Sequence, residues 1–395
     1  YSVRQEQFLT EKERGPDGEF GPEWGEVVLI EEENYYFKLA EHRQWLLDLI
    51  DKRSAAGNPL VVPDFRVAEL RNAVEKLAGD LCISRPKSRL TWGIELPFDR
   101  DFVTYVWFDA LSNYISFAGY DAVPGADLSL FKSRWPAVHV IGKDILAPPH
   151  GIYWLIMLHA LGFTDEEMPT LLVHGWWNRS GEKMSKSLGN AIDPVALVEE
   201  FGLDPLRYFL LREVPFGADG DFARKALANR LNGELADALG NLANRTLSLI
   251  QRNCEGKLPE TAPAVGDDVA LLESLAAMPG MVGKHVEDQA FHLALEEVFR
   301  LVRAANGYIT AQAPWALKKT DPVRMAAVLR HLHSVLRGAA TALQPFMPGS
   351  MAALLDQLAV PEDTRDLAAL ATALPGGTAL PPPSPLFRKI EIEAA

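Results

Sequence analysis

Cysteine is scarce in this chain, and its scarcity excludes two classes of architecture. The 395 residues contain 2 cysteines, Cys82 and Cys254, which lie far apart and outside any Cys-x-x-Cys spacing. A disulfide framework and a zinc site made of four cysteines are therefore excluded within the chain. Sparing use of cysteine is typical of a reducing compartment, so we expect a cytoplasmic protein.

Long apolar runs and a strong basic charge are also missing. No segment approaches the roughly 18 uninterrupted apolar residues of a membrane span, and no signal peptide is visible, so we expect no membrane partner. The formal net charge is −14. Phosphate contacts need Lys and Arg, so this charge argues against binding of nucleic acid over the whole surface, although a local basic surface remains compatible with it. The length suggests two to three domains.

Periodicity predicts a mixed first half. Residues 26–51 predict a strand followed by a helix that includes Tyr36 and Leu39, and residues 63–81 predict a second helix with Asp64 as its N-cap. Beyond residue 97, three short apolar runs alternate with helical stretches, which predicts parallel βαβ units. About three strands are half of a doubly wound sheet. The runs occupy residues 102–110, 137–142 and 170–175.

The second half predicts helices after a loop-rich connector. Residues 176–222 lack a clear period, whereas the pattern from Asp221 to about residue 375 is helical. We therefore expect an α/β part followed by an all-α part.

The segment between Gly181 and Gly189 carries the strongest chemical signal. It contains Lys183-Met184-Ser185-Lys186-Ser187 and follows a predicted strand. When a carboxylate attacks the α-phosphate of ATP, charge develops on the departing pyrophosphate, and two lysines there would stabilise it. A solvated basic loop is the alternative for a generic lysine pair. This pentapeptide, however, is expected by chance in on the order of one chain in ten thousand of this length.

The pentapeptide resembles the KMSKS signature of class I aminoacyl-tRNA synthetases, and segments along the chain resemble methionyl-tRNA synthetases in the family's order. These segments are residues 1–13, 33–50, 82–98, 105–117, 139–145, 174–190, 202–211, 239–245 and 312–319.

The resemblance implies four parts. Residues 1–97 would be part of a connective insertion, and residues 98–175 the second half of the nucleotide-binding catalytic fold. Residues 176–222 would carry the KMSKS loop and a connector that contacts the tRNA stem. Residues 223–395 would form a helical anticodon-binding domain.

Six positions match the methionine pocket of the family. Trp107, Ala110 and Tyr114 have the i, i+3, i+7 spacing of one helical face, although a packed aromatic stripe has the same spacing. A thioether is recognised by shape and by sulfur–aromatic contact, and Tyr114 could also donate its hydroxyl to the sulfur. The other three positions are Ile145, His150 and Trp154.

The approach to His150 departs from the family pattern. One extra residue separates it from the Gly-Lys-Asp-Ile segment, and Pro148 and Pro149 must alter the backbone there. The position of His150 is therefore open, and a lone histidine is often structural.

Further positions match the ATP site and the anticodon-reading surface. Lys183 and Lys186 would be catalytic. The ATP-binding positions are Glu95, Gly142, Asp144, Trp177, Lys183, Ser185 and Lys186. RNA loops are read by stacking and by hydrogen bonds to base edges. The anticodon-reading positions are Asn241, Arg245 and Trp315. A buried tryptophan beside a capped helix is the alternative for the last group.

The implied reaction is the ATP-dependent activation of L-methionine, followed by its transfer to tRNA(Met). Magnesium would accompany the ATP, and no protein ligand for a metal is identified. Zinc is not expected, because the cysteine knuckles of many family members are missing. We expect a monomer.

No HIGH-type motif occurs in the sequence. We expect this motif upstream of Tyr1, and we expect residues 1–395 alone to be inactive in methionine activation. Two alternatives stay open. One is a non-catalytic tRNA-binding or scaffold protein derived from a synthetase, which the intact KMSKS segment opposes. The other is a class I synthetase for another small apolar amino acid.

Replacing Lys186 tests the assignment of the pentapeptide. Lys186→Ala in the full-length protein should slow formation of the adenylate and leave the affinity for methionine nearly unchanged, because the contact is made mainly in the transition state. Methionine-dependent pyrophosphate exchange measures both quantities. Exchange at the unmodified rate would contradict the assignment.

Overall fold

The computed structural model describes residues 1–4, 9, 11–15, 17–29, 32–184 and 189–391. The chain divides into two units, which are treated separately below. The first contains residues 1–139 and 144–172, and the second contains residues 140–143 and 173–395. Within the described residues, no helix is long and apolar enough to cross a membrane.

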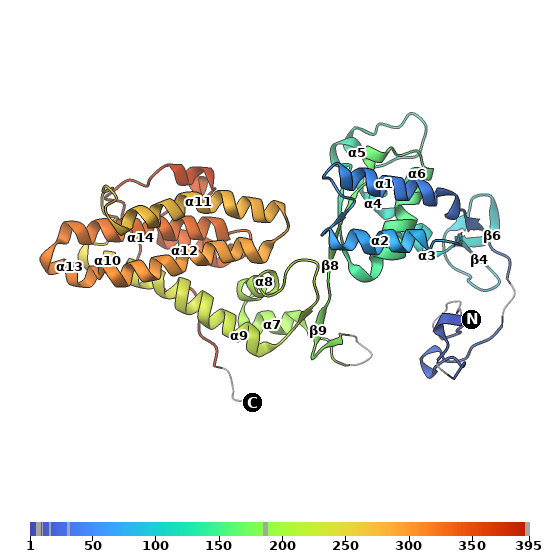
Figure 1. The fold of residues 1–395 in the computed structure, drawn as a ribbon, viewed down its shortest axis with the longest axis horizontal. Helices are drawn as coiled ribbons and strands as arrows, with labels where there is room; N and C mark the ends of the chain where they lie inside the picture. The colour runs from blue at the N-terminus through green and yellow to red at the C-terminus, as the bar shows by residue number, and fades with distance from the viewer. Residues whose placement is uncertain (5–8, 10, 16, 30–31, 185–188, 392–395) are drawn as a thin grey trace. The chain divides into compact units, whose positions relative to one another are not determined.

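A small sheet of three strands belongs to the first part of the chain, and Figure 1 labels its strand β8. Its strands are β2 (Val61–Val62), β8 (Thr170–His174) and β7 (Val138–Gly142), in the order β2-β8-β7. Strands β2 and β8 are parallel, with Val61 opposite Leu171. The predicted strands at 137–142 and 170–175 are therefore confirmed. Strand β2 was not predicted, because two residues are too few to show a period.

The predicted strand at 102–110 is wrong in its partners and its length. Strand β6 (Asp99–Thr104) pairs antiparallel with β4 (Ser84–Pro86) and β5 (Glu95–Leu96), in a separate sheet. The chain then enters helix α3 (Val106–Ala110). Strand β6 begins Asp-Arg-Asp and is largely exposed at that end, whereas a parallel sheet is covered on both faces and needs apolar strands.

The helices of the first unit are shorter than predicted. Helix α1 spans Arg43–Ala55, and Tyr36 lies upstream of it in strand β1 (Tyr36–Phe37), which pairs with β3 (Leu81–Cys82). Helix α2 spans Phe65–Glu75 and confirms the second predicted helix. Asp64 precedes α2, but its side chain caps no backbone N–H, because its own backbone is already helical.

The first unit contains further helices. They are α4 (Asn113–Ala118), α5 (Ser129–Arg134), a π-helix (Leu146–Trp154) and α6 (Leu155–Ala160).

The second unit opens with a small sheet and two short helices. Strand β9 (Trp177–Arg179) pairs antiparallel with β10 (Glu182–Lys183) and parallel with β11 (Gly220–Asp221). The helices are α7 (Pro194–Phe201) and α8 (Leu203–Arg212). The prediction of a loop-rich connector is therefore wrong over these helices. The sequence contained a start signal, because Asp193 caps α7 through Val195 N–H and Pro194 occupies its first turn.

The rest of the second unit is a helical bundle, as predicted. Helix α9 (Arg224–Arg230) continues through a π-helical segment (Leu231–Gly240) into α10 (Asn241–Asn253). Helix α14 is buried on nearly all sides and forms the centre of the core with α11 and α12. The bundle helices are α11 (Asp267–Glu287), α12 (Phe291–Gln312), α13 (Pro314–Thr320), α14 (Pro322–Leu343) and α15 (Pro348–Gln357).

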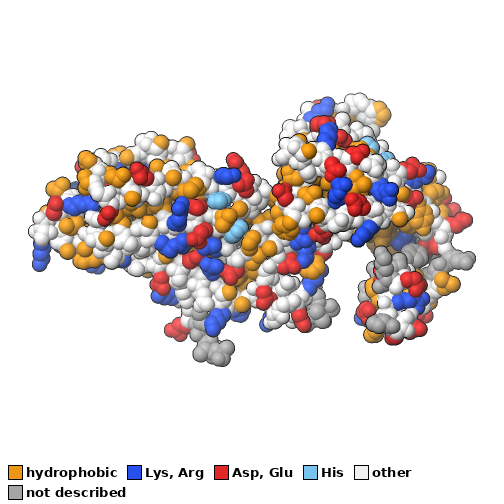
Figure 2. Space-filling view, viewed as in Figure 1, with side chains coloured by type: hydrophobic (Ala, Val, Ile, Leu, Met, Phe, Trp, Pro, Cys, Tyr) orange, Lys and Arg blue, Asp and Glu red, His pale blue; other side chains and the backbone are white. Residues whose placement is uncertain are grey.

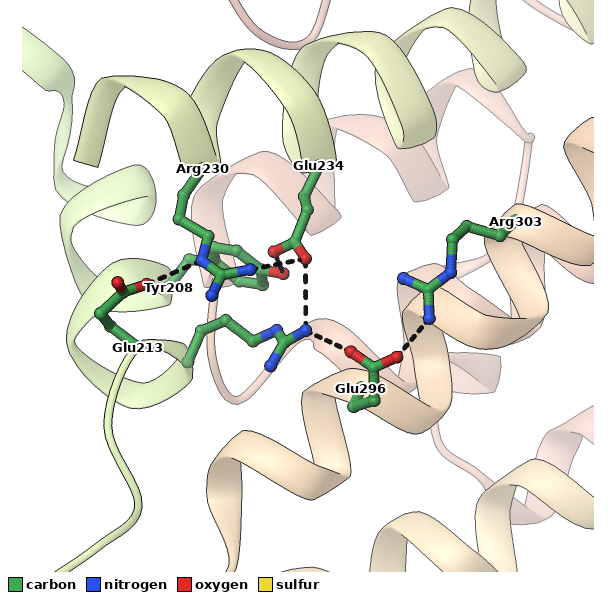
Figure 3. Close-up of polar contacts among 7 residues, drawn as sticks. Tyr208, Glu213, Arg230, Glu234, Glu296 and Arg303 are labelled. Atoms are coloured by element: carbon green, nitrogen blue, oxygen red, sulfur yellow. Dashed lines mark hydrogen bonds and ion pairs between the residues drawn. The ribbon is translucent and has the colours of Figure 1, made fainter. Parts of the chain in front are cut away.

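A network of charged side chains joins α8 to the bundle (Figure 3). Glu234 accepts hydrogen bonds from the Tyr208 hydroxyl at 2.5 Å, from Arg230 at 2.9 Å and from Arg212 at 3.2 Å. Arg212 also forms an ion pair with Glu296 on α12. Arg212 and Glu234 are largely buried, so each of these two charges needs its partner. The network fixes the helix that continues into α10.

A second buried charge lies at the start of α11. The Asp268 carboxylate is fully buried and accepts two hydrogen bonds from Arg324, at 2.6 and 2.7 Å, and one from the Tyr308 hydroxyl. Burial by itself raises the pKa of Asp268, but the bonds from Arg324, Tyr308 and the Val265 N–H outweigh it and hold this pKa well below its usual range.

Removing this charge should destabilise the bundle. Asp268→Asn should lower the free energy of unfolding by about 3 kcal/mol at pH 7, because Arg324 loses its buried partner. Since the pKa is depressed in the folded state, the charge stabilises the fold above the pKa of an unfolded aspartate, and this stabilisation is lost as the pH falls. Urea unfolding at pH 7 and near pH 3 should show a smaller difference between variant and parent at the lower pH. Asp288→Asn, on the exposed end of the same helix, is the control.

Candidate functional site

Four aromatic side chains of the first unit form a compact group, named here the aromatic cluster: Tyr114, His139, His150 and Trp154. The Tyr114 ring centroid lies 4.2 Å from that of His139, 5.6 Å from that of His150 and 5.8 Å from that of Trp154. Both histidines and Trp154 are buried, whereas Tyr114 is partly exposed. Tyr114 is therefore the member that can offer a surface to a ligand.

Hydrogen bonds fix the proton positions in the aromatic cluster. The Nδ1 atom of His150 lies 2.9 Å from the Ile145 carbonyl oxygen, which can only accept, so Nδ1 carries the proton. The neutral ring then accepts at Nε2, and the Tyr114 hydroxyl 2.8 Å away donates to it. The hydroxyl proton is thus committed to His150. Tyr114 offers a thioether its ring, and the predicted donation to sulfur does not fit this arrangement.

Burial keeps the aromatic cluster uncharged. It lowers the pKa of His139 to about 4, with a further contribution from His150. It lowers the pKa of His150 as well, although the bond to Ile145 acts in the opposite sense, and it raises the pKa of Tyr114. An uncharged wall suits an apolar ligand, because it imposes no demand for a counter-ion.

The extra residue before His150 falls in the segment Leu146–Trp154, which is π-helical but interrupted. Ala147 has non-helical φ and ψ angles, and Pro149 lies within the segment. The contact from His150 back to Ile145 is made by the imidazole side chain across this interruption. His150 therefore meets Tyr114 despite the departure from the family spacing.

Trp107 and Ala110 lie on α3, and Tyr114 lies on the separate helix α4. The predicted single helical face is therefore interrupted between Ala110 and Asn113. All three residues are partly exposed, which argues against a fully packed aromatic stripe. Ile145 is also partly exposed, whereas Trp154 is completely buried.

The predicted ATP-binding residues lie on several elements. Glu95 is on β5 and forms ion pairs with Lys87 and, at 4.0 Å, with Arg100. The hydrogen bond from Lys87 lowers the pKa of Glu95, which keeps an exposed carboxylate ionised. Gly142 ends strand β7, and Asp144 follows in a short 3-10 turn. The Trp177 ring packs on Phe209 in the core of the second unit, so its side chain is structural.

Lys183 stands at the end of a tight hairpin. Strands β9 and β10 are joined by Ser180 and Gly181, both with positive φ, which matches the twist of a two-residue hairpin. The ammonium of Lys183 lies 3.8 Å from the Trp176 ring centroid, and that of Lys143 lies 4.1 Å from it. Asp219 accepts hydrogen bonds from the Trp176 N–H and from Lys143. Ser185 and Lys186 lie outside the described residues.

The second unit carries the predicted anticodon-reading residues. Asn241 and Arg245 lie one turn apart on α10, and the Arg245 guanidinium carbon is 5.4 Å from the Trp315 ring centroid. Trp315 is 48% exposed, so the alternative of a buried tryptophan is wrong. Lys318 and Lys319 follow on α13, and Figure 2 shows basic side chains at that end of the helical bundle.

Two side chains near these positions were not predicted. His139 lies three residues before Gly142 on an alternating strand, where its type alone gave no signal. Trp176 precedes the predicted Trp177 in the same Trp-Trp pair, so the pair was a signal that could have included it. Within the described part of the chain, no group of three or more His, Cys, Asp or Glu side chains is arranged to hold a metal ion.

Two protein-family models match the chain. The family model described as class I tRNA synthetases (M) matches residues 25–247, and the anticodon binding domain of methionyl tRNA ligase matches residues 258–395. The chain belongs to the methionyl-tRNA synthetase family. The resemblance stated from the sequence is confirmed.

Methionyl-tRNA synthetases of known sequence and structure resemble the chain over nearly all of its length. The methionine–tRNA ligase of Brucella suis biovar 1 is 44% identical over 98% of this chain and 74% of the relative. That of Mycobacterium tuberculosis H37Rv is 40% identical over 99% of this chain and 75% of the relative. The structure of the Mycobacterium tuberculosis methionyl-tRNA synthetase in complex with methionyl-adenylate matches with a TM-score of 0.87 at 40% identity, covering 98% of this chain and 75% of that one.

Trp315 provides a test of the exposed surface on α10 and α13. Trp315→Ala in the full-length protein should reduce aminoacylation of tRNA(Met) by a loss of roughly 1–3 kcal/mol if one base stacks on the ring. Pyrophosphate exchange without tRNA should be unchanged. Val323→Ala, which removes another exposed apolar side chain of the bundle, is the control. A parallel fall in both activities would show that Trp315 supports the fold.

Proposed function

We propose that this chain activates L-methionine with ATP and transfers it to the 3′ end of tRNA(Met). A methionine carboxylate oxygen forms a bond to the α-phosphorus, the bond from that phosphorus to the bridging oxygen of the β-phosphate breaks, and pyrophosphate leaves. The terminal ribose hydroxyl of the tRNA then attacks the carbonyl carbon, its proton is lost, and AMP leaves. Family membership, supported by the KMSKS segment, carries the proposal.

Several residues are assigned contacts to ATP. Lys183 and Lys186 stabilise the charge that develops on pyrophosphate. Glu95 accepts hydrogen bonds from ribose hydroxyls, for which its ionised state is suited. Gly142, Asp144, Ser185 and the backbone groups of Trp177 are assigned further contacts to ATP. Magnesium, when bound with ATP, neutralises phosphate charge, and the chemistry assigned to these lysines is compatible with it.

Methionine recognition rests on the partly exposed face of Tyr114, with Trp107, Ala110 and Ile145 as further walls. His150 and Trp154 support Tyr114 from the buried side. A methionine side chain has no charge and a weakly accepting sulfur, so shape and sulfur–aromatic contact select it. The uncharged state of the aromatic cluster supports this role.

Asn241, Arg245 and Trp315 read the anticodon of tRNA(Met). An exposed tryptophan beside a guanidinium offers a splayed base both a stacking surface and hydrogen-bond donors. We further propose that the protein acts in the cytoplasm.

Pyrophosphate exchange with single amino acids tests the proposed function. The full-length protein should exchange with methionine and far less with leucine, isoleucine or valine. Tyr114→Ala should raise KM for methionine about tenfold, because a sulfur–aromatic contact contributes about 0.3–1.5 kcal/mol and loss of the ring leaves a cavity. Tyr36→Ala, at an exposed tyrosine on β1, should leave the kinetics unchanged. Retained binding of tRNA without any exchange would instead indicate a non-catalytic tRNA-binding protein.

A further inference from the structure

His139 is a buried polar side chain to which neither the sequence resemblance nor the proposed reaction assigns a role. It lies on strand β7 and is 5% exposed. Its Nε2 atom accepts a hydrogen bond from the Trp154 indole N–H at 3.2 Å. Its ring lies against Tyr114 at 4.2 Å and meets the edge of Trp135 at 5.9 Å.

The bond from Trp154 defines the state of the His139 ring. An indole N–H can only donate, so Nε2 must present its lone pair and the ring proton must lie on Nδ1. A charged imidazolium would direct an N–H at another N–H and would carry an uncompensated charge among buried rings. The arrangement therefore requires a neutral histidine.

Tyr114 is confined from three sides as a result. The His139 ring packs against its ring at a tilt of 54°, Trp154 lies beside it, and His150 accepts the hydrogen bond of its hydroxyl. His150 is fixed in turn by the Ile145 carbonyl. Packing against His139 therefore fixes the position of the Tyr114 ring, and the hydrogen bond to His150 fixes the direction of its hydroxyl.

We propose that His139 is a positioning residue for methionine recognition, acting by supporting the Tyr114 ring and by accepting the hydrogen bond of Trp154. This inference rests on the proposed function, because it takes the exposed face of Tyr114 as the surface that meets the thioether. His139 itself does not touch the substrate. Its effect on methionine binding passes through Tyr114.

Two properties of histidine matter here, and substitutions separate them. His139→Phe keeps an aromatic ring beneath Tyr114 but leaves the buried Trp154 N–H without an acceptor. His139→Gln keeps an acceptor but removes the ring. The double variant His139→Phe/Trp154→Phe keeps an aromatic ring at position 139. It also removes the Trp154 indole N–H, so no buried donor is left without an acceptor.

The test is steady-state pyrophosphate exchange by the full-length protein, with KM for methionine, KM for ATP and kcat measured separately. His139→Phe should raise KM for methionine about tenfold, since an orphaned buried donor must find water or distort its surroundings. KM for ATP and kcat should stay within about twofold, because uniform binding energy alone is lost. His139→Gln should recover part of the loss. His159→Phe, which alters a histidine stacked on Trp45 in the same unit, is the matched control.

The double variant makes the test specific for the pair. If the loss in His139→Phe comes from the unpaired Trp154 N–H, the double variant should have a KM for methionine close to that of the single variant Trp154→Phe, so that the two effects do not add. Additive effects would overturn the proposed pairing. Equal losses in KM for methionine, KM for ATP and kcat would overturn the positioning role and indicate general damage to the unit.

Tyr114→Ala separates failure of this inference from failure of the proposed function. An unchanged KM for methionine in His139→Phe, together with a raised KM in Tyr114→Ala, would overturn the role of His139 and leave the pocket assignment in place. An unchanged KM in both variants would show that methionine binds elsewhere. If His139→Phe does not fold, His139→Gln and the double variant carry the same comparison.

Discussion

The hydrogen bond from His150 to the Ile145 carbonyl determines the chemistry of the aromatic cluster. A carbonyl oxygen accepts and never donates, so this contact assigns the proton of His150, and that assignment makes the Tyr114 hydroxyl the donor to the other ring nitrogen. The same reasoning applied to Trp154 assigns the proton of His139. The proton positions of both histidines thus follow from one backbone carbonyl and one indole N–H.

In the second unit, too, buried polar groups need hydrogen-bond partners, and there the groups are charged. Glu234 accepts hydrogen bonds from three side chains. Asp268 accepts two hydrogen bonds from Arg324 and one from Tyr308. Buried ion pairs of this kind add little net stability compared with apolar packing, but a helix displaced from them would leave a charge unpaired. They therefore define which helix positions are allowed. The helix that contains Glu234 continues into α10, so the pairing determines where Arg245 is presented.

The sequence predicted the parts of the structure in which chemistry is local. The KMSKS pentapeptide, the two apolar strands β7 and β8 and the helical bundle were all visible in short windows of sequence. Strand β2 was not predicted, because two residues show no period. Strand β6 was assigned to the wrong sheet, because its apolar C-terminal end resembles a buried strand although its first residues are exposed. The tertiary pairs were out of reach, because the bond from Trp154 to His139 joins residues 15 apart through a fold that periodicity does not encode. The roles of His139 and Trp154 depend on their burial, which only the folded chain shows.

Recognition of methionine and of triphosphate imposes opposite electrostatic demands, and the residues assigned to each differ accordingly. Around Tyr114 burial disfavours charge, because it lowers the pKa values of His139 and His150 and raises that of Tyr114. Uncharged rings are what the proposed contact with a thioether needs. Around Trp176 the ammonium groups of Lys143 and Lys183 lie over one aromatic face, which attracts a cation through the ring quadrupole. Asp219 forms an ion pair with Lys143 and accepts a hydrogen bond from the Trp176 backbone N–H. A ring and a carboxylate therefore place these two lysines together, whereas hydrogen bonds between uncharged groups place the rings around Tyr114.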